Sequence, residues 1–386
     1  MSKIDDLIAQ YCPDGVEWKE LGDIAEYRRG SFPQPYGNAE WYNGEGAMPF
    51  VQVADVAANM KLVNNTKQKI SLKAQPKSIF VPKGTVIVTL QGSIGRVAIT
   101  QYDSYVDRTL AIFLKYKFDI NIKYFAYQLE SKFNIEKEFA RGSTLKTITK
   151  EEFTKFQIPI PPLPVQEEIV SILDKFIELE AELEAELEAR TRQYEYYRNE
   201  LLSFEGKDVE WKKLKDVLEL KRGTRVVKSQ LETNGNIPVY QNSLKPLGYF
   251  NKSNSLAKST FIICAGAAGD LGFSEIPFWA ADDCFVFNHN NLIQSRFLYY
   301  FLNTKQDFLY SRVRRASIPR LSRESIENIK IPIPPIEEQE RIVAILDKFD
   351  ALVNDISTGL PAEIQARRQQ YEYYRGKLLT FEPLTA

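Results

Sequence analysis

A short segment in the second half of the chain has the side chains that bind phosphate groups. Residues 312–323 contain five arginines and no acid, and the side chains that we single out here are Arg312, Arg314, Arg315, Ser317 and Arg320. A guanidinium group donates two parallel hydrogen bonds to a phosphate or to the edge of a guanine, and a hydroxyl group adds a phosphate contact. This composition indicates recognition of a phosphate-bearing polymer, although an ordinary solvated loop could have it too.

Further basic and hydroxyl side chains lie at corresponding places in the two halves of the chain. Some close the first half, some follow the first strand-like segment of each half, and two lie in a glycine-containing turn. These additional candidates for contact with phosphates or bases are Arg28, Arg29, Ser93, Arg96, Arg141, Ser143, Lys146, Lys221, Arg222 and Arg225. For the clusters after the first strand, plain surface is an equally good interpretation.

Side chains for catalysis are scarce. The chain has one histidine, His289, and three widely separated cysteines without a CxxC pair, which argues against a zinc site and a Ser-His-Asp triad. There is no Walker A loop. Asp14, Glu17 and Lys19 superficially resemble the carboxylates and lysine of a nuclease, but they are crowded into one short segment. We therefore expect no catalytic residue, no metal ligand and no cofactor bound by this chain.

The elements that must position the basic side chains occur twice. The interiors of the two copies, residues 31–140 and 224–313, match only in hydrophobic pattern, whereas their ends match closely. The matching ends are Val-Glu-Trp-Lys at 16–19 and 209–212, Ile-Pro-Ile-Pro-Pro at 158–162 and 331–335, Ile-Leu-Asp-Lys-Phe at 172–176 and 345–349, and Tyr-Glu-Tyr-Tyr-Arg at 194–198 and 371–375. Such a repeat indicates a duplicated unit with one scaffold and two different contact surfaces. Neutral divergence of a structural domain is the alternative.

Two long helices are expected to follow the proline-rich junctions. Apolar residues at spacings of three and four predict a rod of about 38 residues after segment 161–164. Leu179, Leu183 and Leu187 belong to a tandem Leu-Glu-Ala-Glu repeat in this rod, which would act as a ruler. A second apolar stripe begins at Ile336 and is interrupted at 357–361, where glycine and proline predict a break. We expect the two helices to pair antiparallel; otherwise each would pack on its own domain.

The bulk properties are compatible with this organisation. The 386 residues are 44% hydrophobic and 26% charged, and the formal net charge is −1, so the overall charge does not indicate a binder of nucleic acids. The absence of a long apolar run and of a signal-like start, together with the cysteine content, leads us to expect a cytoplasmic protein that does not enter a membrane.

We predict an α+β protein in which two repeated target recognition domains are separated by two long helices that form an antiparallel, pseudo-twofold symmetric coiled coil. The expected domains are 1–157 and 207–330 for recognition, and 158–206 and 331–386 for the spacer helices.

The matched junctions and helix ends resemble those of the specificity subunit of type I restriction–modification systems, and the resemblance covers essentially the whole chain. It implies two target recognition domains, each reading one half of a split site in double-stranded DNA. It also implies docking of two methyltransferase subunits and of restriction subunits. Those partners would use S-adenosylmethionine, ATP and Mg²⁺. Recognition residues vary within this family, so the resemblance assigns none of them.

The resulting hypothesis is a non-catalytic subunit that binds an asymmetric, interrupted DNA site. Two other interpretations stay open at this point. One is the recognition subunit of another bipartite restriction system. The other is a coiled-coil scaffold with two adaptor domains that do not bind DNA; such a protein would not need basic loops at corresponding points of its two halves.

Overall fold

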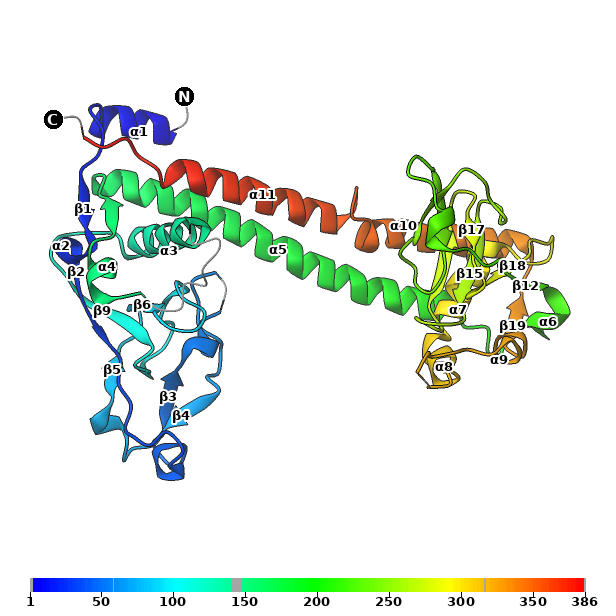
Figure 1. Cartoon of the computed structure of the whole chain (residues 1–386), viewed down its shortest axis with the longest axis horizontal. Helices are drawn as coiled ribbons and strands as arrows, with labels where there is room; N and C mark the ends of the chain where they lie inside the picture. The colour runs from blue at the N-terminus through cyan, green and yellow to red at the C-terminus, as the bar shows by residue number, and fades with distance from the viewer. Residues whose placement is uncertain (1–2, 58, 140–147, 316, 385–386) are drawn as a thin grey trace. The chain divides into compact units, whose positions relative to one another are not determined.

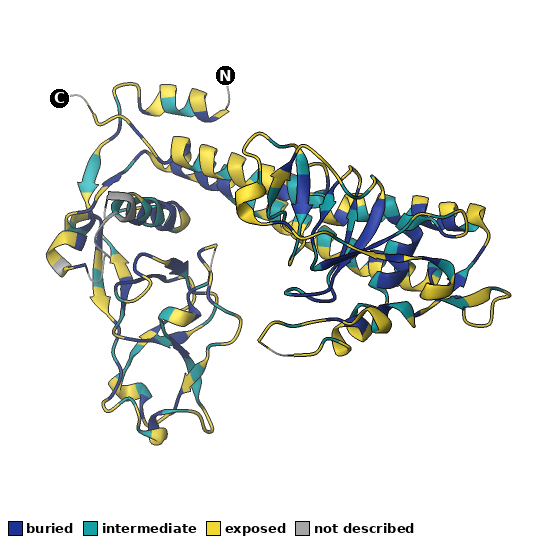
Figure 2. Cartoon of the chain, turned by 45° about the vertical axis from the view of Figure 1, so that its right-hand side comes forward, coloured by how far each residue is buried: buried dark blue, intermediate teal, exposed yellow. Residues whose placement is uncertain are grey.

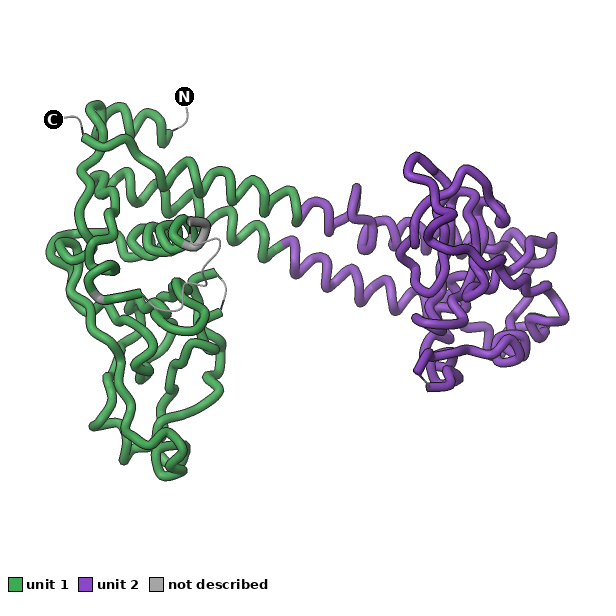
Figure 3. Tube along the Cα trace, viewed as in Figure 1, with its two compact units in different colours: residues 1–182, 365–386 green, residues 183–364 purple. Residues whose placement is uncertain are grey.

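The chain forms two compact units. A computed structural model describes residues 3–57, 59–139, 148–315 and 317–384. Unit 1 consists of Met1–Glu182 and Gln365–Ala386, and unit 2 of Leu183–Ile364 (Figure 3). Helix α5 (Leu163–Leu201) begins in unit 1 and ends in unit 2. The division shows that each unit takes part of both predicted spacer segments.

Unit 1 combines an inner and an outer four-stranded sheet with helices that cover the inner one (Figure 1). The inner sheet has the order β2-β9-β6-β7, the outer sheet has the order β4-β3-β8-β5, and β1 pairs with β10. The elements are α1 (Lys3–Tyr11), β1 (Trp18–Glu20), α2 (Leu21–Ile24), β2 (Ala25–Arg29), η1 (Ala39–Trp41), β3 (Met48–Val51), η2 (Val53–Asp55), β4 (Gln68–Ile70), η3 (Gln75–Lys77), β5 (Ile79–Val81), β6 (Val86–Thr89), β7 (Val97–Ile99), β8 (Ser104–Val106), β9 (Leu110–Tyr116), α3 (Ile122–Phe139), α4 (Lys150–Thr154) and β10 (Gln157–Pro159).

Unit 2 repeats this arrangement, with three strands in its outer sheet where unit 1 has four. Its inner sheet is β12-β18-β15-β16, its outer sheet is β14-β13-β17, and β11 pairs with β19. The elements are β11 (Glu210–Lys213), α6 (Leu214–Val217), β12 (Leu220–Arg222), η4 (Lys228–Gln230), β13 (Ile237–Tyr240), β14 (Gly248–Phe250), β15 (Ser259–Ile263), β16 (Leu271–Ser274), β17 (Trp279–Ala280), β18 (Cys284–Phe287), α7 (Ser295–Asn303), α8 (Gln306–Ser311), α9 (Arg323–Glu327), β19 (Lys330–Ile333), α10 (Ile336–Asn354) and α11 (Leu360–Leu378), of which α11 lies mostly in unit 1. The predicted α+β class and the duplication are confirmed.

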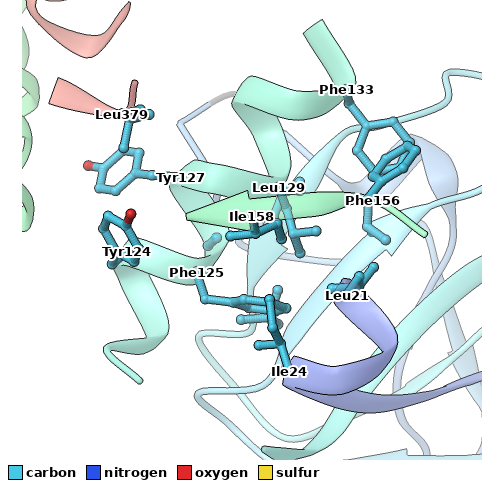
Figure 4. Close-up of a cluster of buried hydrophobic side chains, with 14 of the residues drawn as sticks. Leu21, Ile24, Tyr124, Phe125, Tyr127, Leu129, Phe133, Phe156, Ile158 and Leu379 are labelled. Carbon is cyan, nitrogen blue, oxygen red and sulfur yellow. The ribbon is translucent and has the colours of Figure 1, made fainter. Parts of the chain in front are cut away.

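The core of each unit lies between the inner sheet and one aromatic-rich helix. In unit 1, Tyr124, Phe125 and Phe133 of α3 are fully buried. Phe133 packs against Phe156, and Leu21 and Ile158 belong to the same cluster of buried side chains (Figure 4). In unit 2, α7 buries Phe297, Tyr300 and Phe301 in the same way. The aromatic residues of these helices are therefore core residues, and further buried clusters lie within the sheets of each unit (Figure 2).

The start and the end of the chain meet in unit 1. Val16 and Pro383 form a parallel bridge, in which the Val16 amide donates to the Glu382 carbonyl at 2.9 Å and the Leu384 amide donates to the Val16 carbonyl at 2.9 Å. In unit 2 the corresponding Leu-Leu-Ser-Phe-Glu segment, residues 201–205, continues along the chain into β11. A junction that is covalent in unit 2 is thus made by hydrogen bonds in unit 1.

The long helices pair within each unit. In unit 1 the rings of Phe176 and Tyr374 stack with centroids 5.5 Å apart, and Arg368 Nε donates to Glu180 Oε1 at 2.5 Å. The residue numbers rise on α5 while they fall on α11, so this pair is antiparallel. In unit 2 the Tyr197 ring stacks on Phe349 of α10 at 5.6 Å. The expected pairing of the helices is confirmed inside each unit, where both helices of the pair also contribute to the core of the globular domain.

The second spacer segment is broken where the sequence predicted it. α10 ends at Asn354 and α11 begins at Leu360. In the turn between them, Asp355 accepts hydrogen bonds from the Thr358 hydroxyl and the Ser357 amide, both at 2.7 Å. These two bonds also hold the pKa of Asp355 below its usual value, the Thr358 hydroxyl having the larger effect. The turn therefore replaces helical hydrogen bonds that the chain cannot form before Pro361.

A buried glutamine fastens each long helix to its domain. The Gln166 side chain accepts from the Asn121 amide at 2.9 Å and donates to the Pro161 carbonyl at 2.7 Å. Gln339 accepts from the Gln294 amide at 2.8 Å and donates to the carbonyls of Leu292 and Pro334, both at 2.9 Å. These contacts explain why glutamine recurs four residues after each Pro-Pro pair.

We expect Gln339→Met to lower the free energy of unfolding by about 2–4 kcal/mol, because it leaves buried backbone groups without partners. Urea unfolding followed by circular dichroism measures the effect. Glu340→Gln, at the exposed neighbouring position, is the control. Equal midpoints for Gln339→Met and the control would contradict the structural role of Gln339.

Candidate DNA interface

The arginine-rich segment of unit 2 is a short hairpin held against the inner sheet. The Arg314 amide donates to the Arg320 carbonyl at 2.8 Å, and the Arg320 amide donates back to the Arg314 carbonyl at 3.1 Å. Arg320 also bridges to Ala265, in the turn after β15, and the Leu321 amide donates to the Cys264 carbonyl at 2.9 Å. The hairpin thereby places Arg314 and Arg320 beside the end of a central strand.

These arginines surround a cleft of about 600 Å³. Arg222 at the end of β12 and Arg312 after α8 contribute to its wall, and Phe285, Leu321 and Ala265 supply its apolar part. Burial raises the pKa of the Cys264 thiol to about 11, so this side chain is neutral at neutral pH and does not offset the arginine charges. The cleft combines a concentrated positive charge with apolar side chains.

The guanidinium groups of the cleft differ in the partners that they already have within the chain. Arg323 pairs with Glu327 at 2.7 Å, and Arg222 Nε donates to the Asp282 carbonyl at 2.8 Å. Among the described residues, Arg314 and Arg320 have no carboxylate partner. Their guanidinium groups are therefore the best placed to take an external anion.

Unit 1 has a cleft of about 280 Å³ at the corresponding place. It is lined by Arg29, which corresponds to Arg222, and by Ile148 and Thr149, which correspond to Leu321 and Ser322. The hydroxyls of Thr149 and Ser322 both accept from the amide three residues later, at 3.2 Å in each case, and so begin α4 and α9. Arg28, Tyr27, Leu90 and Phe153 complete the lining. The duplicated fold therefore presents the same site twice, with different side chains.

A glycine after each of these arginines is required by close packing. A Cβ atom on Gly30 would lie 2.1 Å from the Val106 carbonyl oxygen, and one on Gly223 would lie 2.1 Å from that of Ala281. Both glycine amides donate to the strand that pairs with β2 or β12, at 3.1 Å to Leu110 and 3.0 Å to Cys284. The Arg-Gly pair thus fixes where the arginine leaves the sheet.

The other predicted contact residues are distributed around these clefts. Lys221, Arg225, Arg315 and Ser317 are exposed but do not line a described cleft. Ser93 and Arg96 are exposed in the turn after β6, where Arg96 Nη1 donates to the Val56 carbonyl at 3.3 Å. Arg141, Ser143 and Lys146 lie outside the described residues.

The three spacer leucines lie on α5. Leu187 packs against the core of unit 2, Leu183 is partly buried, and Leu179 is 37% exposed. The leucine repeat therefore contributes less core contact in its first turn than in its last.

Sequence reasoning missed two features. Arg323 belongs to the unit 2 cleft although its position in the sequence did not single it out. The chain between residues 57 and 83 has six lysines and no acid, which are Lys61, Lys67, Lys69, Lys73, Lys77 and Lys83. The missing acids could have revealed this segment, but its lysines are too widely spaced to stand out as a cluster.

Two further features would bear on function in the described part of the chain, a cluster of metal ligands and a membrane-spanning helix. No three histidine, cysteine, aspartate or glutamate side chains gather there as metal ligands would. None of the helices found there is both long and apolar enough to cross a membrane.

Several other proteins are similar to this chain in both sequence and fold. The model of the type I restriction modification DNA specificity domain matches residues 13–189 and 206–366. The EcoR124I/EcoR124II specificity subunit of Escherichia coli is 35% identical over 292 residues, which are 67% of this chain and 71% of that protein. The EcoprrI specificity subunit, also from E. coli, is 28% identical over 364 residues and covers 89% of each chain.

A crystal structure of a type I restriction–modification S subunit from M. genitalium has a TM-score of 0.61 at 19% identity, over 95% of this chain and 96% of that one. The S subunit fold is thus shared despite low identity. With two matches to the specificity domain, one for each half of the chain, this protein belongs to the family of type I restriction–modification specificity subunits.

Proposed function

We propose that each unit reads one half of an asymmetric, interrupted site in double-stranded DNA. The observation that carries this proposal is the arginine-bearing cleft found at the same place in both units with different linings. A shared position supports a shared task, and different side chains support different half-sites. Phosphate contacts would fix the register of each domain, and a few polar side chains would read base edges in the major groove.

In unit 2, Arg314 and Arg320 are the proposed primary contacts. Their guanidinium groups are free of acidic partners among the described residues, and their hairpin is held on both sides by backbone hydrogen bonds. Little ordering would then be needed on binding, which favours affinity. In unit 1, Arg28 and Arg29 are the proposed contacts because they line the cleft of that unit, although Arg29 corresponds in position to Arg222.

The chemistry of modification and cleavage is proposed to belong to partner subunits. Two methyltransferase subunits would use S-adenosylmethionine, and restriction subunits would use ATP and Mg²⁺, while this chain would bind no cofactor and would act in the cytoplasm, where the host DNA lies. The methyltransferase would flip its adenine out of the duplex, so the task of this chain is to position it.

Two copies of one partner are supported by a pair of matching tyrosine surfaces. Tyr196 is 61% exposed and Tyr373, at the equivalent position, is 65% exposed. Each has an edge-on contact with the next tyrosine, at 5.4 Å and 5.3 Å between ring centroids. Folding does not require an exposed aromatic residue at the same position of both copies. A partner that binds once to each copy does require the same contact residue in both.

Replacing Arg314, Arg315 and Arg320 with alanine should weaken DNA binding by the assembled complex about 10-fold for each arginine–phosphate hydrogen bond that the change removes. The measurement is a titration of a fluorescent duplex that contains the methylated site. Arg190→Ala with Arg192→Ala is the control, because these arginines pair with Glu186 and Glu188 on α5. Unchanged affinity and site choice would count against the hairpin.

Deleting one Leu-Glu-Ala-Glu unit, residues 183–186, should shorten the unread gap of the target. Four helical residues span about 6 Å, which is one or two base-pair steps. Genome-wide mapping of N6-methyladenine gives the new gap. Glu184→Gln with Glu186→Gln keeps the length and should keep the gap. An unaltered methylation pattern in the deletion variant would refute the ruler function.

Tyr196→Ser should remove one of two methyltransferase subunits from the complex, and Tyr196→Ser with Tyr373→Ser should remove both. An interface tyrosine contributes about 2 kcal/mol or more, so affinity for each partner copy should fall by roughly 30-fold. Analytical ultracentrifugation measures the stoichiometry. Leu256→Ser, at another strongly exposed apolar residue, is the control. Two bound partners in the double variant would exclude this surface.

A further inference from the structure

The outer sheet of unit 1 carries a strongly basic surface that the proposed reading clefts do not include. The six lysines between residues 57 and 83 are all exposed, but only Lys67, Lys69, Lys73 and Lys77 belong to the outer-sheet surface. Lys61 and Lys83 instead line a cleft together with Asp174 and Glu178 of α5. Lys69 is the middle residue of the edge strand β4, where it points outward while Ile70 is buried. β3 and β4 lie at the end of unit 1 that is remote from α3 and α5 (Figure 1).

Some acids near this surface are occupied, while Asp103, in the turn before β8, is exposed and accepts a hydrogen bond from the Lys83 amide at 2.8 Å. Asp55 is 2% exposed and accepts hydrogen bonds from the amides of Gln52 and Lys67, at 2.8 Å and 2.9 Å. Glu40 pairs with Lys73 at 2.5 Å. Glu45 lies in the turn before β3 and is exposed. Among the described residues, Lys67, Lys69 and Lys77 have no carboxylate partner, so their charges are not neutralised within the chain.

A tryptophan holds two of the lysines in place. The Lys77 ammonium lies 4.7 Å from the centroid of the Trp41 ring, and that of Lys73 lies 5.7 Å from it. A lysine over an aromatic face keeps its charge at the surface but loses part of its freedom. An ordinary solubilising lysine has no need of such a contact.

Unit 2 has the same combination on its outer sheet. Lys252 follows the edge strand β14, and its ammonium lies 5.7 Å from the Phe250 ring and 5.6 Å from the Trp279 ring. Residues 224–258 contain a single acid, Glu232, which hydrogen-bonds with Asn251. The basic residues of this stretch are Arg225, Lys228, Lys245, Lys252 and Lys258. Basic outer sheets thus recur in both units, although the sequences of these interiors have diverged.

We propose that the outer sheets bind the phosphate backbone of double-stranded DNA through these lysines, outside the arginine clefts. This inference rests on the proposed function of the clefts. A solubilising surface mixes charges of both signs, whereas these stretches are nearly free of acids in a chain whose net charge is −1. Lysine is a point charge on a flexible stem, which suits contact with phosphates but not the reading of bases. The outer sheets would therefore add affinity and fix register without choosing the sequence.

The test is the salt dependence of DNA binding by the complex of the full chain with its methyltransferase subunits. Each phosphate contact contributes about 0.9 to the slope of log K against log salt concentration. A triple variant combines Lys67→Ala, Lys69→Ala and Lys77→Ala. It should reduce the steepness of that slope by between about 1 and 3. The methylated sequence should stay the same. Lys252→Ala should reduce it by about 1.

The matched control is Lys115→Ala with Lys155→Ala, two exposed lysines of unit 1 that pair with Glu26 and Glu151. This pair should leave the slope unchanged. An unchanged slope in the triple variant would overturn the proposal while the clefts stand. The proposal would also be overturned if the triple variant failed to assemble with the methyltransferase subunits while the slope stayed the same. The lysine surface would then bind an acidic protein and not DNA. If the complex of the unsubstituted chain bound duplexes of all sequences equally well, the proposed function itself would be refuted.

Discussion

Each globular domain is fixed to a long helix by buried hydrogen bonds, and every other property of the structure depends on this attachment. Gln166 and Gln339 join their helix to the backbone of the domain, and both are almost fully buried. Tyr127 donates to Asp174 at 3.0 Å, and Tyr300 donates to Asp347 at 2.5 Å. A domain that turned on its helix would have to break several buried bonds at once, at a cost of about 1–3 kcal/mol for each group left unpaired. A reading surface can be oriented only if this attachment is stiff.

The two attachments differ in strength for a physical reason. In unit 1, Lys123 pairs with Asp174 at 2.5 Å, and both side chains are partly exposed. In unit 2 the equivalent residue is Arg296, which bonds to Asp347 at 2.8 Å and contacts the ring of Phe273 at 4.5 Å. Burial has the largest single effect and lowers the pKa of Arg296, but the hydrogen bond to Asp347 and the interactions with Tyr300 together outweigh it, and the pKa is raised. A planar, delocalised cation can be paired and stacked at once, which an ammonium group cannot do equally well.

Duplication with divergence separates scaffold from contact surface. Many of the matched residues make buried or close contacts, such as the glutamines and the glycines after the arginines, whereas the matched Tyr196 and Tyr373 are exposed. The residues that line the clefts differ between the two units, although Arg29 and Arg222 lie at corresponding ends of inner-sheet strands. The lysines over tryptophan show that the outer sheets follow the same division: a buried framework carries a variable charged surface.

The sequence by itself determined the repeat, the long helices, their break near Gly359 and the family. These follow from local spacing, since apolar residues at three and four positions and a Gly-Pro interruption have few other solutions. It also pointed to Arg29, Arg222, Arg314 and Arg320.

Only the tertiary structure decided that Arg222 joins Arg314 and Arg320 in one cleft, that the two clefts are equivalent, and that the chain ends complete unit 1. These features depend on hydrogen bonds between segments tens to hundreds of residues apart. Side-chain composition shows that such groups need partners, but it does not show which distant group supplies them.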